Sequence, residues 1–237
     1  MKQVKMLTAL GLLAVAGAAN AEVSGSMGIA SSYLWRGYDL GKGTPAISAD
    51  LHASAKGFYG GIWGSSGDSA NHDNNTPSDP TDDYINGTEY DLYAGYAGAA
   101  GPVTYDVSYW TYSYPTIKLR PGNLSELVTS VGVGPVSAFL LYNINDTGTN
   151  VKGDATNGDY QYYGLKAKVS DFSFVLGHHN KANTGGTAQN LTHADVSYAY
   201  NANLSFTVSV PVDVKSGTGD KPADPTFVAS YSVPFGK

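Results

Sequence analysis

The sequence predicts an all-β protein, a transmembrane antiparallel up-and-down β-barrel of about twelve strands with short periplasmic turns and longer extracellular loops. Apolar and polar residues alternate with period two through many segments, and several of these reach the 9–11 residues, roughly, of a bilayer-crossing strand. Tight turns and long polar connections follow each other along the chain. The chain has no cysteine, which excludes a disulfide framework. In lipid, only a closed sheet satisfies the backbone of such strands.

The first 21 residues have the three parts of a secretory signal peptide. Lys2 and Lys5 precede an apolar run, and Ala19-Asn20-Ala21 provides a small-residue cleavage site. The apolar run is shorter than the roughly 20 residues of a membrane-spanning helix. We therefore expect cleavage after Ala21, one barrel domain over residues 22–237, and export to the cell outer membrane of a Gram-negative bacterium.

The formal charge argues against nucleic acid as a partner. It is −6 for the whole chain, and removal of Lys2 and Lys5 gives −6 − 2 = −8 for the mature chain. A nucleic-acid-binding surface requires the opposite sign. The partners that we expect are outer-membrane lipid and small polar solutes or ions.

The clearest alternation lies between residues 47 and 63. Ile47 and Leu51 share a face opposite Asp50, and the chain reverses at Lys56-Gly57 before a new strand begins at Phe58. We expect the other strands at 23–33, 88–97, 103–112, 126–133, 136–142, 160–169, 172–179, 192–200, 204–210 and 226–235. Long polar connections are expected at 36–44, 67–87, 113–123, 143–158, 180–190 and 212–222.

The last strand has the form that barrel-assembly machinery recognises. Apolar residues stand at every second position down to Phe235, as Phe227, Ala229, Tyr231 and Val233. Gly236 and Lys237 follow, a departure from the usual terminal aromatic residue. We expect the assembly machinery to be a partner through the strand that ends at Phe235.

Four segments together resemble the TorF family of proteobacterial outer-membrane proteins, regarded as porins on their architecture and also described as proteins of unknown function. The segments are YLWRG at 33–37, GFYGGIWGS at 57–65, EYDLYAGY at 89–96 and the aromatic strand ending in Tyr-Pro at 105–115. The resemblance covers most of the mature chain and is most specific before Pro115. It implies an outer-membrane barrel and porin, and it provides no catalytic residues.

The functional candidates are charged residues that strand parity places inside the barrel. With Arg36 near the mouth of the first hairpin, they are Asp50, His52, Glu89, Asp91, Asp106, Glu126, Lys166, Lys168, His193 and Asp195. Rings of charge in a lumen bias the passage of ions, and an excess of acids favours cations. The alternative is that acids and bases pair across the lumen and only stabilise it.

The sequence favours a pore for small polar solutes or ions, with a bias for cations, over two other functions. An outer-membrane enzyme such as a lipase requires a Ser–His pair with an orienting polar group on the lipid-facing rim, and no pair stands out. An inward His52 or His193 would count against the enzyme. A closed structural or adhesive barrel is the third possibility. We predict no enzymatic activity and no catalytic residue.

One loop is rich in acids, but it lacks a metal-binding motif. Residues 68–83 carry five aspartates without Lys or Arg, and carboxylates could bind Ca²⁺ weakly. The EF-hand spacing is missing, so a solvated extracellular loop is the preferred interpretation. We predict no metal and no cofactor.

Overall fold

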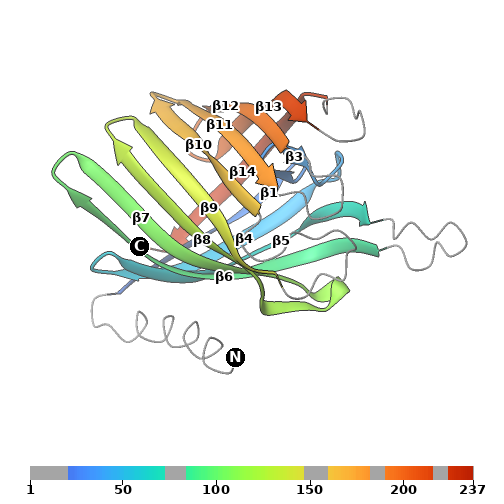
Figure 1. The fold of residues 1–237 in the computed structure, drawn as a ribbon, viewed down its shortest axis with the longest axis horizontal. Helices are drawn as coiled ribbons and strands as arrows, with labels where there is room; N and C mark the ends of the chain where they lie inside the picture. The colour runs from blue at the N-terminus through green and yellow to red at the C-terminus, as the bar shows by residue number, and fades with distance from the viewer. Residues whose placement is uncertain (1–20, 73–83, 147–159, 182–189, 216–223, 237) are drawn as a thin grey trace, which may run out of the picture.

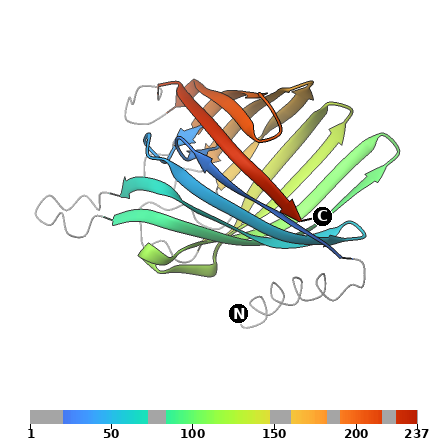
Figure 2. The same cartoon turned by 180° about the vertical axis from the view of Figure 1, so that it is seen from behind.

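A computed structural model describes residues 21–72, 84–146, 160–181, 190–215 and 224–236. Twelve antiparallel strands form a closed barrel, confirming the predicted fold class (Figure 1). The ring closes between the first and the last strand, which lie side by side with Ser24 opposite Gly236 (Figure 2). Among the described residues, no helix is long and apolar enough to cross a membrane.

The barrel strands follow chain order around the ring, with β1 between β14 and β4. They are β1 (Glu22–Ala30), β4 (Ala46–Ala55), β5 (Phe58–His72), β6 (Tyr84–Ala100), β7 (Val103–Tyr114), β8 (Leu119–Val133), β9 (Val136–Asp146), β10 (Tyr160–Val169), β11 (Phe172–Lys181), β12 (Asn190–Ala199), β13 (Leu204–Lys215) and β14 (Thr226–Gly236). Two short strands, β2 (Leu34–Trp35) and β3 (Tyr38–Asp39), form a separate two-stranded sheet, and η2 (Pro115–Ile117) is a 3₁₀ helix between β7 and β8.

One end of the barrel carries the short turns, and we call it the turn end. The turn between β4 and β5 is Lys56-Gly57, with φ of 52° and 86°. Positive φ at both central residues is the type I′ geometry that matches the twist of a hairpin. The opposite end, which carries the longer connections, is called the loop end.

The outer surface of the barrel is apolar. Many aliphatic and aromatic side chains on alternate strand positions are exposed there, among them Met27 at 60%, Ile47 at 63% and Val196 at 42%. Aromatic rings pair outside near the turn end, with Phe58 on Tyr96 at 4.8 Å and Phe172 on Tyr198 at 5.0 Å between ring centroids. An apolar band with aromatic girdles is the surface that faces lipid in such barrels.

Several strands are longer at the loop end than we predicted. β5 continues to His72 and β6 begins at Tyr84, within the expected loop 67–87, while β7, η2 and β8 take up most of 113–123. The expected first strand 23–33 instead ends at Ala30. Alternating hydropathy marks only the part of a strand that faces lipid, whereas backbone pairing continues through polar sequence. Residues 1–20 and 73–83 lie outside the described residues. They contain the predicted signal peptide up to Asn20 and most of the acidic loop.

Candidate functional site

The connection between β1 and β4, expected as a polar loop at 36–44, contains a small hairpin, β2–β3. Trp35 pairs with Tyr38, and the two residues between them have positive φ, 49° at Arg36 and 86° at Gly37. Arg-Gly thus forms a type I′ turn, although a non-glycine residue at positive φ is strained. Such strain persists only where surrounding contacts enforce it.

Those contacts come from the opposite wall of the barrel. The Arg36 guanidinium donates from Nη1 and Nη2 to the two carboxylate oxygens of Glu126 on β8, at 3.0 and 2.6 Å. It also donates to the hydroxyls of Tyr112 on β7 and Tyr160 on β10, each at 3.2 Å. β8 and β10 lie across the ring from β1 and β4, so the hairpin spans the lumen. Arg36 therefore lies inside the barrel, where it contacts Tyr160 at the loop-end limit of β10.

Two histidines hold the other side of the hairpin tip. His179 on β11 donates from Nε2 to the backbone carbonyl of Arg36 at 2.7 Å and is fully buried. A Cβ atom on Gly37 would lie 2.4 Å from Cγ of His193 on β12. Only glycine fits at this position, because both the left-handed backbone and the imidazole exclude a side chain.

The base of the hairpin is fixed to the wall as well. The backbone N–H of Ser31 donates to the carbonyl of Ala229 on β14 at 2.9 Å. Tyr33 donates through its hydroxyl to Glu89 on β6 at 2.8 Å, and Tyr114 donates to the other oxygen of the same carboxylate at 2.7 Å. The hairpin is thus bonded at its base and at its tip.

The side of the lumen beneath the hairpin is packed. Glu89, Asp91, Glu126 and His193 are each 3% exposed or less. Asp91 lies within electrostatic reach of both glutamates and of Arg36, and its buried Oδ1 has no hydrogen-bond partner among the described residues. Burial of an incompletely paired carboxylate costs free energy, and this cost offsets part of the Arg36–Glu126 attraction. Strong contacts therefore hold the hairpin over Asp91, a buried carboxylate that would be more stable in water.

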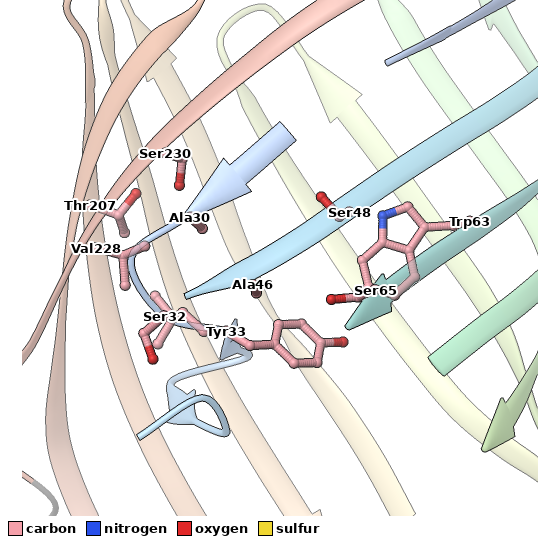
Figure 3. A pocket seen from close by; sticks show the side chains of 11 residues that line it. Ala30, Ser32, Tyr33, Ala46, Ser48, Trp63, Ser65, Thr207, Val228 and Ser230 are labelled. Carbon is pink, nitrogen blue, oxygen red and sulfur yellow. The ribbon is translucent and has the colours of Figure 1, made fainter. Parts of the chain in front are cut away.

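On the other side of the lumen, the described residues line two hollows against β1, β4 and β5. The loop-end hollow, of about 200 Å³, lies beside the base of the hairpin (Figure 3). Its lining is Ala30, Ser32, Tyr33, Leu34, Ala46, Ser48, Trp63, Ser65, Thr207, Val228 and Ser230. The turn-end hollow, of about 360 Å³, is lined by Glu22, Ser54, Ala55, Lys56, Gly57, Tyr59 and Ala97.

Asp50 and His52 on β4 lie between these two hollows along the same wall. His52 contacts Asp50 through Nδ1 at 2.9 Å and Ser24 through Nε2 at 3.0 Å, and its side chain is 37% exposed. The order Ser–His–Asp is that of a hydrolase triad. Because β1 is paired on both sides, its N–H groups serve the sheet and are not available as oxyanion donors. The inward positions of His52 and His193 count against a lipase on the lipid-facing rim.

The remaining predicted residues also lie on inner-face positions, and none of the hydrogen bonds described for Arg36 reaches them. Asp106 accepts from the Tyr59 hydroxyl at 2.8 Å, and Asp195 lies 2.8 Å from Nδ1 of His193. Lys166 Nζ lies 4.8 Å from the centre of the Phe139 ring, and Lys168 follows two positions along β10. Their role in conduction remains a prediction.

The alternation of inward and outward positions along the strands could not predict which residues contact the hairpin. Tyr112, Tyr160 and His179 come from three strands, and nothing in their spacing connects them to Arg36. A weak signal was present in Trp35-Arg36-Gly37-Tyr38 itself, where two aromatic residues flank a dipeptide that ends in glycine. Within the described residues, no group of three or more His, Cys, Asp or Glu could hold a metal ion.

The fold and the lumen define a class of protein, a transmembrane β-barrel with an inward-folded hairpin. The chain belongs to a bacterial family described as "Bacterial protein of unknown function (Gcw_chp)", whose model matches residues 14–224. The TorF label stays a prediction.

A comparison with curated proteins finds no match. Solved structures that resemble the barrel include "KdgM porin", at 10% identity with a TM-score of 0.46, and "KdgM porin in complex with disordered oligogalacturonate", at 9% and 0.44. Each match covers 91% of this chain and 98% of the other. A chain described under "Unveiling the Mechanism Behind the in-meso Crystallization of Membrane Proteins" has 6% identity and a TM-score of 0.54, covering 91% of this chain and 83% of that one. This last likeness shows a shared fold.

Proposed function

We propose that this protein is an outer-membrane pore for small polar solutes or ions and that the β2–β3 hairpin narrows its lumen. The observation that carries the proposal is the pair of hollows at opposite ends of β1, β4 and β5. Between them, the inner positions of β1 carry only Ser24, Ser26 and Gly28. Small side chains on this wall leave room for a solute path beside the packed side.

The proposal includes export and assembly. The signal peptide would be removed after Ala21, and the assembly machinery would recognise the strand that ends at Phe235. The apolar outer band would then face outer-membrane lipid. We propose no enzymatic role. Between the two hollows, the acid that the path reaches is Asp50, whose side chain is 21% exposed. A cation bias would therefore originate at Asp50, and at Glu22 in the turn-end hollow, rather than at the buried Glu89, Asp91 and Glu126.

The seated hairpin also supports a second candidate, a closed barrel with a structural role. Arg36 and its partners fill the lumen on one side, and a lumen that side chains fill completely does not conduct. Electrical measurements separate the two functions, because a pore gives discrete current steps and a closed barrel gives none.

We would reconstitute the mature protein in planar bilayers and compare Gly37→Ala with Gly43→Ala. Both glycines have positive φ, 86° and 76°, so both substitutions strain the backbone. Only at Gly37 would the new methyl group meet another residue, His193, because nothing lies within 4 Å of a Cβ on Gly43. We expect Gly37→Ala to unseat the hairpin and raise single-channel conductance, and Gly43→Ala to behave like the wild type.

Two outcomes would contradict this function. If neither the wild type nor Gly37→Ala conducts, although both fold as heat-modifiable barrels, the protein is not a pore. If the wild type conducts and Gly37→Ala is identical to it, the hairpin does not narrow the path.

A further inference from the structure

We propose that the loop-end hollow is a binding site for an uncharged, polyhydroxylated solute of monosaccharide size. The inference deepens the proposed function, on which it rests, by naming the class of solute that the path accepts.

The lining carries no Asp, Glu, Lys, Arg or His. This is unusual in a lumen whose other wall is strongly charged. An anion that entered the hollow would lose hydration without gaining a counter-charge, and that loss is expensive. It would also approach the carboxylates of Asp39 and Glu89, to which Ser32 and Tyr33 of the lining donate hydrogen bonds. The lining therefore selects against anionic solutes.

Hydroxyl groups dominate the polar part of the lining. They come from five different segments, as Ser32, Ser48, Ser65, Thr207 and Ser230. Ser32, Ser65 and Thr207 have hydrogen bonds within the protein. No hydrogen bond to another described residue engages the hydroxyls of Ser48 and Ser230. Each can both donate and accept, as the hydroxyls of a polyol require.

Trp63 and Tyr33 give the hollow an aromatic wall. Their ring centroids are 6.1 Å apart, at an interplanar angle of 36°. Figure 3 shows both rings beside Ser48 and Ser65. An aromatic surface beside a few placed polar groups is the usual composition of a small-molecule site. The ring face suits the C–H surface of a sugar, while the surrounding hydroxyls suit its edge.

The volume fits a solute of this size. Liquid water occupies about 30 Å³ per molecule, so the hollow of about 200 Å³ has room for a few waters or for one small solute. Drug-sized ligands occupy larger pockets, from about 300 Å³ upward. Because Ser32, Tyr33 and Leu34 belong to the segment that leads into the hairpin, the hollow is complete only while the hairpin is folded inward.

The test compares glucose with glucuronate, which has the same ring and one added carboxylate. Single-channel current of the reconstituted protein is recorded while either sugar is added, and tryptophan fluorescence is titrated in parallel. We expect glucose to reduce the current and to change the fluorescence, and we expect glucuronate to do neither. The fluorescence change should disappear in Trp63→Phe.

Ser48→Val removes one free hydroxyl and keeps a similar shape, and Ser130→Val does the same on the inner face of β8, away from the hollow. We expect Ser48→Val to require about fivefold to tenfold more glucose for half-maximal effect, the loss that one hydrogen bond produces. Ser130→Val should match the wild type. Variants are first checked for the heat-modifiable barrel band.

The results separate the two proposals. If the wild type conducts but glucose changes neither its current nor its fluorescence, the proposed binding site is wrong and the pore proposal stands. An equal response to glucuronate overturns the proposed selection against anionic solutes. If the barrel never conducts, the pore proposal is wrong, and fluorescence alone tests the binding site. A fluorescence response to glucose that Ser48→Val weakens supports the site. The absence of any fluorescence response contradicts it.

Discussion

At the scale of single residues, strand parity predicts which side chains point inward, but it does not predict which of them water reaches. Glu89 is 2% exposed and accepts hydrogen bonds from two tyrosines, whereas the Asp50 side chain is 21% exposed between the two hollows. Both carboxylates occupy the same kind of position on the inner face. The difference arises because the hairpin covers one of them and leaves the other uncovered. A charge acts on passing ions only where solvent and solute can approach it.

We therefore expect Asp50→Asn to reduce any cation preference more than Glu89→Gln does. Each substitution removes one negative charge and keeps a similar side-chain shape, so the pair is matched. The measurement is the reversal potential of the reconstituted protein in a salt gradient. Equal shifts for the two variants would mean that the hairpin does not shield Glu89 in the conducting protein.

At the scale of elements, the hairpin is held mainly by one buried ion pair. Arg36 and Glu126 form a bidentate ion pair, and their side chains are 12% and 4% exposed. A buried pair of this kind adds little net free energy, but removal of one partner leaves the other charge buried and unpaired, at a cost of about 3–5 kcal/mol. This ion pair is thus one point, besides Gly37, at which the seated position of the hairpin can be weakened without altering the backbone pairing of the barrel.

Glu126→Gln should release the hairpin while the barrel persists. A loss of about 3 kcal/mol corresponds to hydrogen exchange roughly a hundredfold faster at the amides of β2 and β3. Asp106→Asn is the control, because Asp106 bonds to Tyr59 and does not contact the hairpin. Unchanged exchange in Glu126→Gln would show that the aromatic contacts of Trp35 and Tyr38 suffice to seat the hairpin.

At the scale of the whole molecule, the two faces of the barrel face different solvents. Val196 is exposed on the outside, and its neighbour Ser197 lies inside, bonded to Thr207 at 2.8 Å. The two residues are adjacent, so they lie at almost the same depth in the bilayer. Lipid cannot solvate a charge, whereas a polar lumen can.

Val196→Lys should therefore destabilise the barrel by about 2–4 kcal/mol if Val196 lies near the bilayer midplane, and by less nearer the interface. Ser197→Lys, at the same depth, should lower the free energy of unfolding by clearly less. Urea unfolding in lipid vesicles, with both variants compared to the wild type, measures the difference. A larger cost for Ser197→Lys would mean that the faces have been assigned the wrong way round.

The sequence by itself determined the barrel, its twelve strands and the inward or outward direction of their side chains. Period two is a local property, and the turns at Lys56-Gly57 and elsewhere are set by two or three neighbouring residues. The expected strand 160–169 has the same limits as β10. These features could be predicted because each depends on residues close together in the chain.

Only the tertiary structure decided that the first long connection folds inward. Arg36 contacts Glu126, which is 90 positions away in the chain, and Tyr160, which is 124 positions away. Contacts at such separation depend on closure of the ring, which places β1 and β4 opposite β8 and β10, and no local pattern encodes that meeting. Closure also determined which inward acids are covered and which face the path. The physical reason is that burial belongs to the assembled lumen, whereas side-chain direction belongs to each strand.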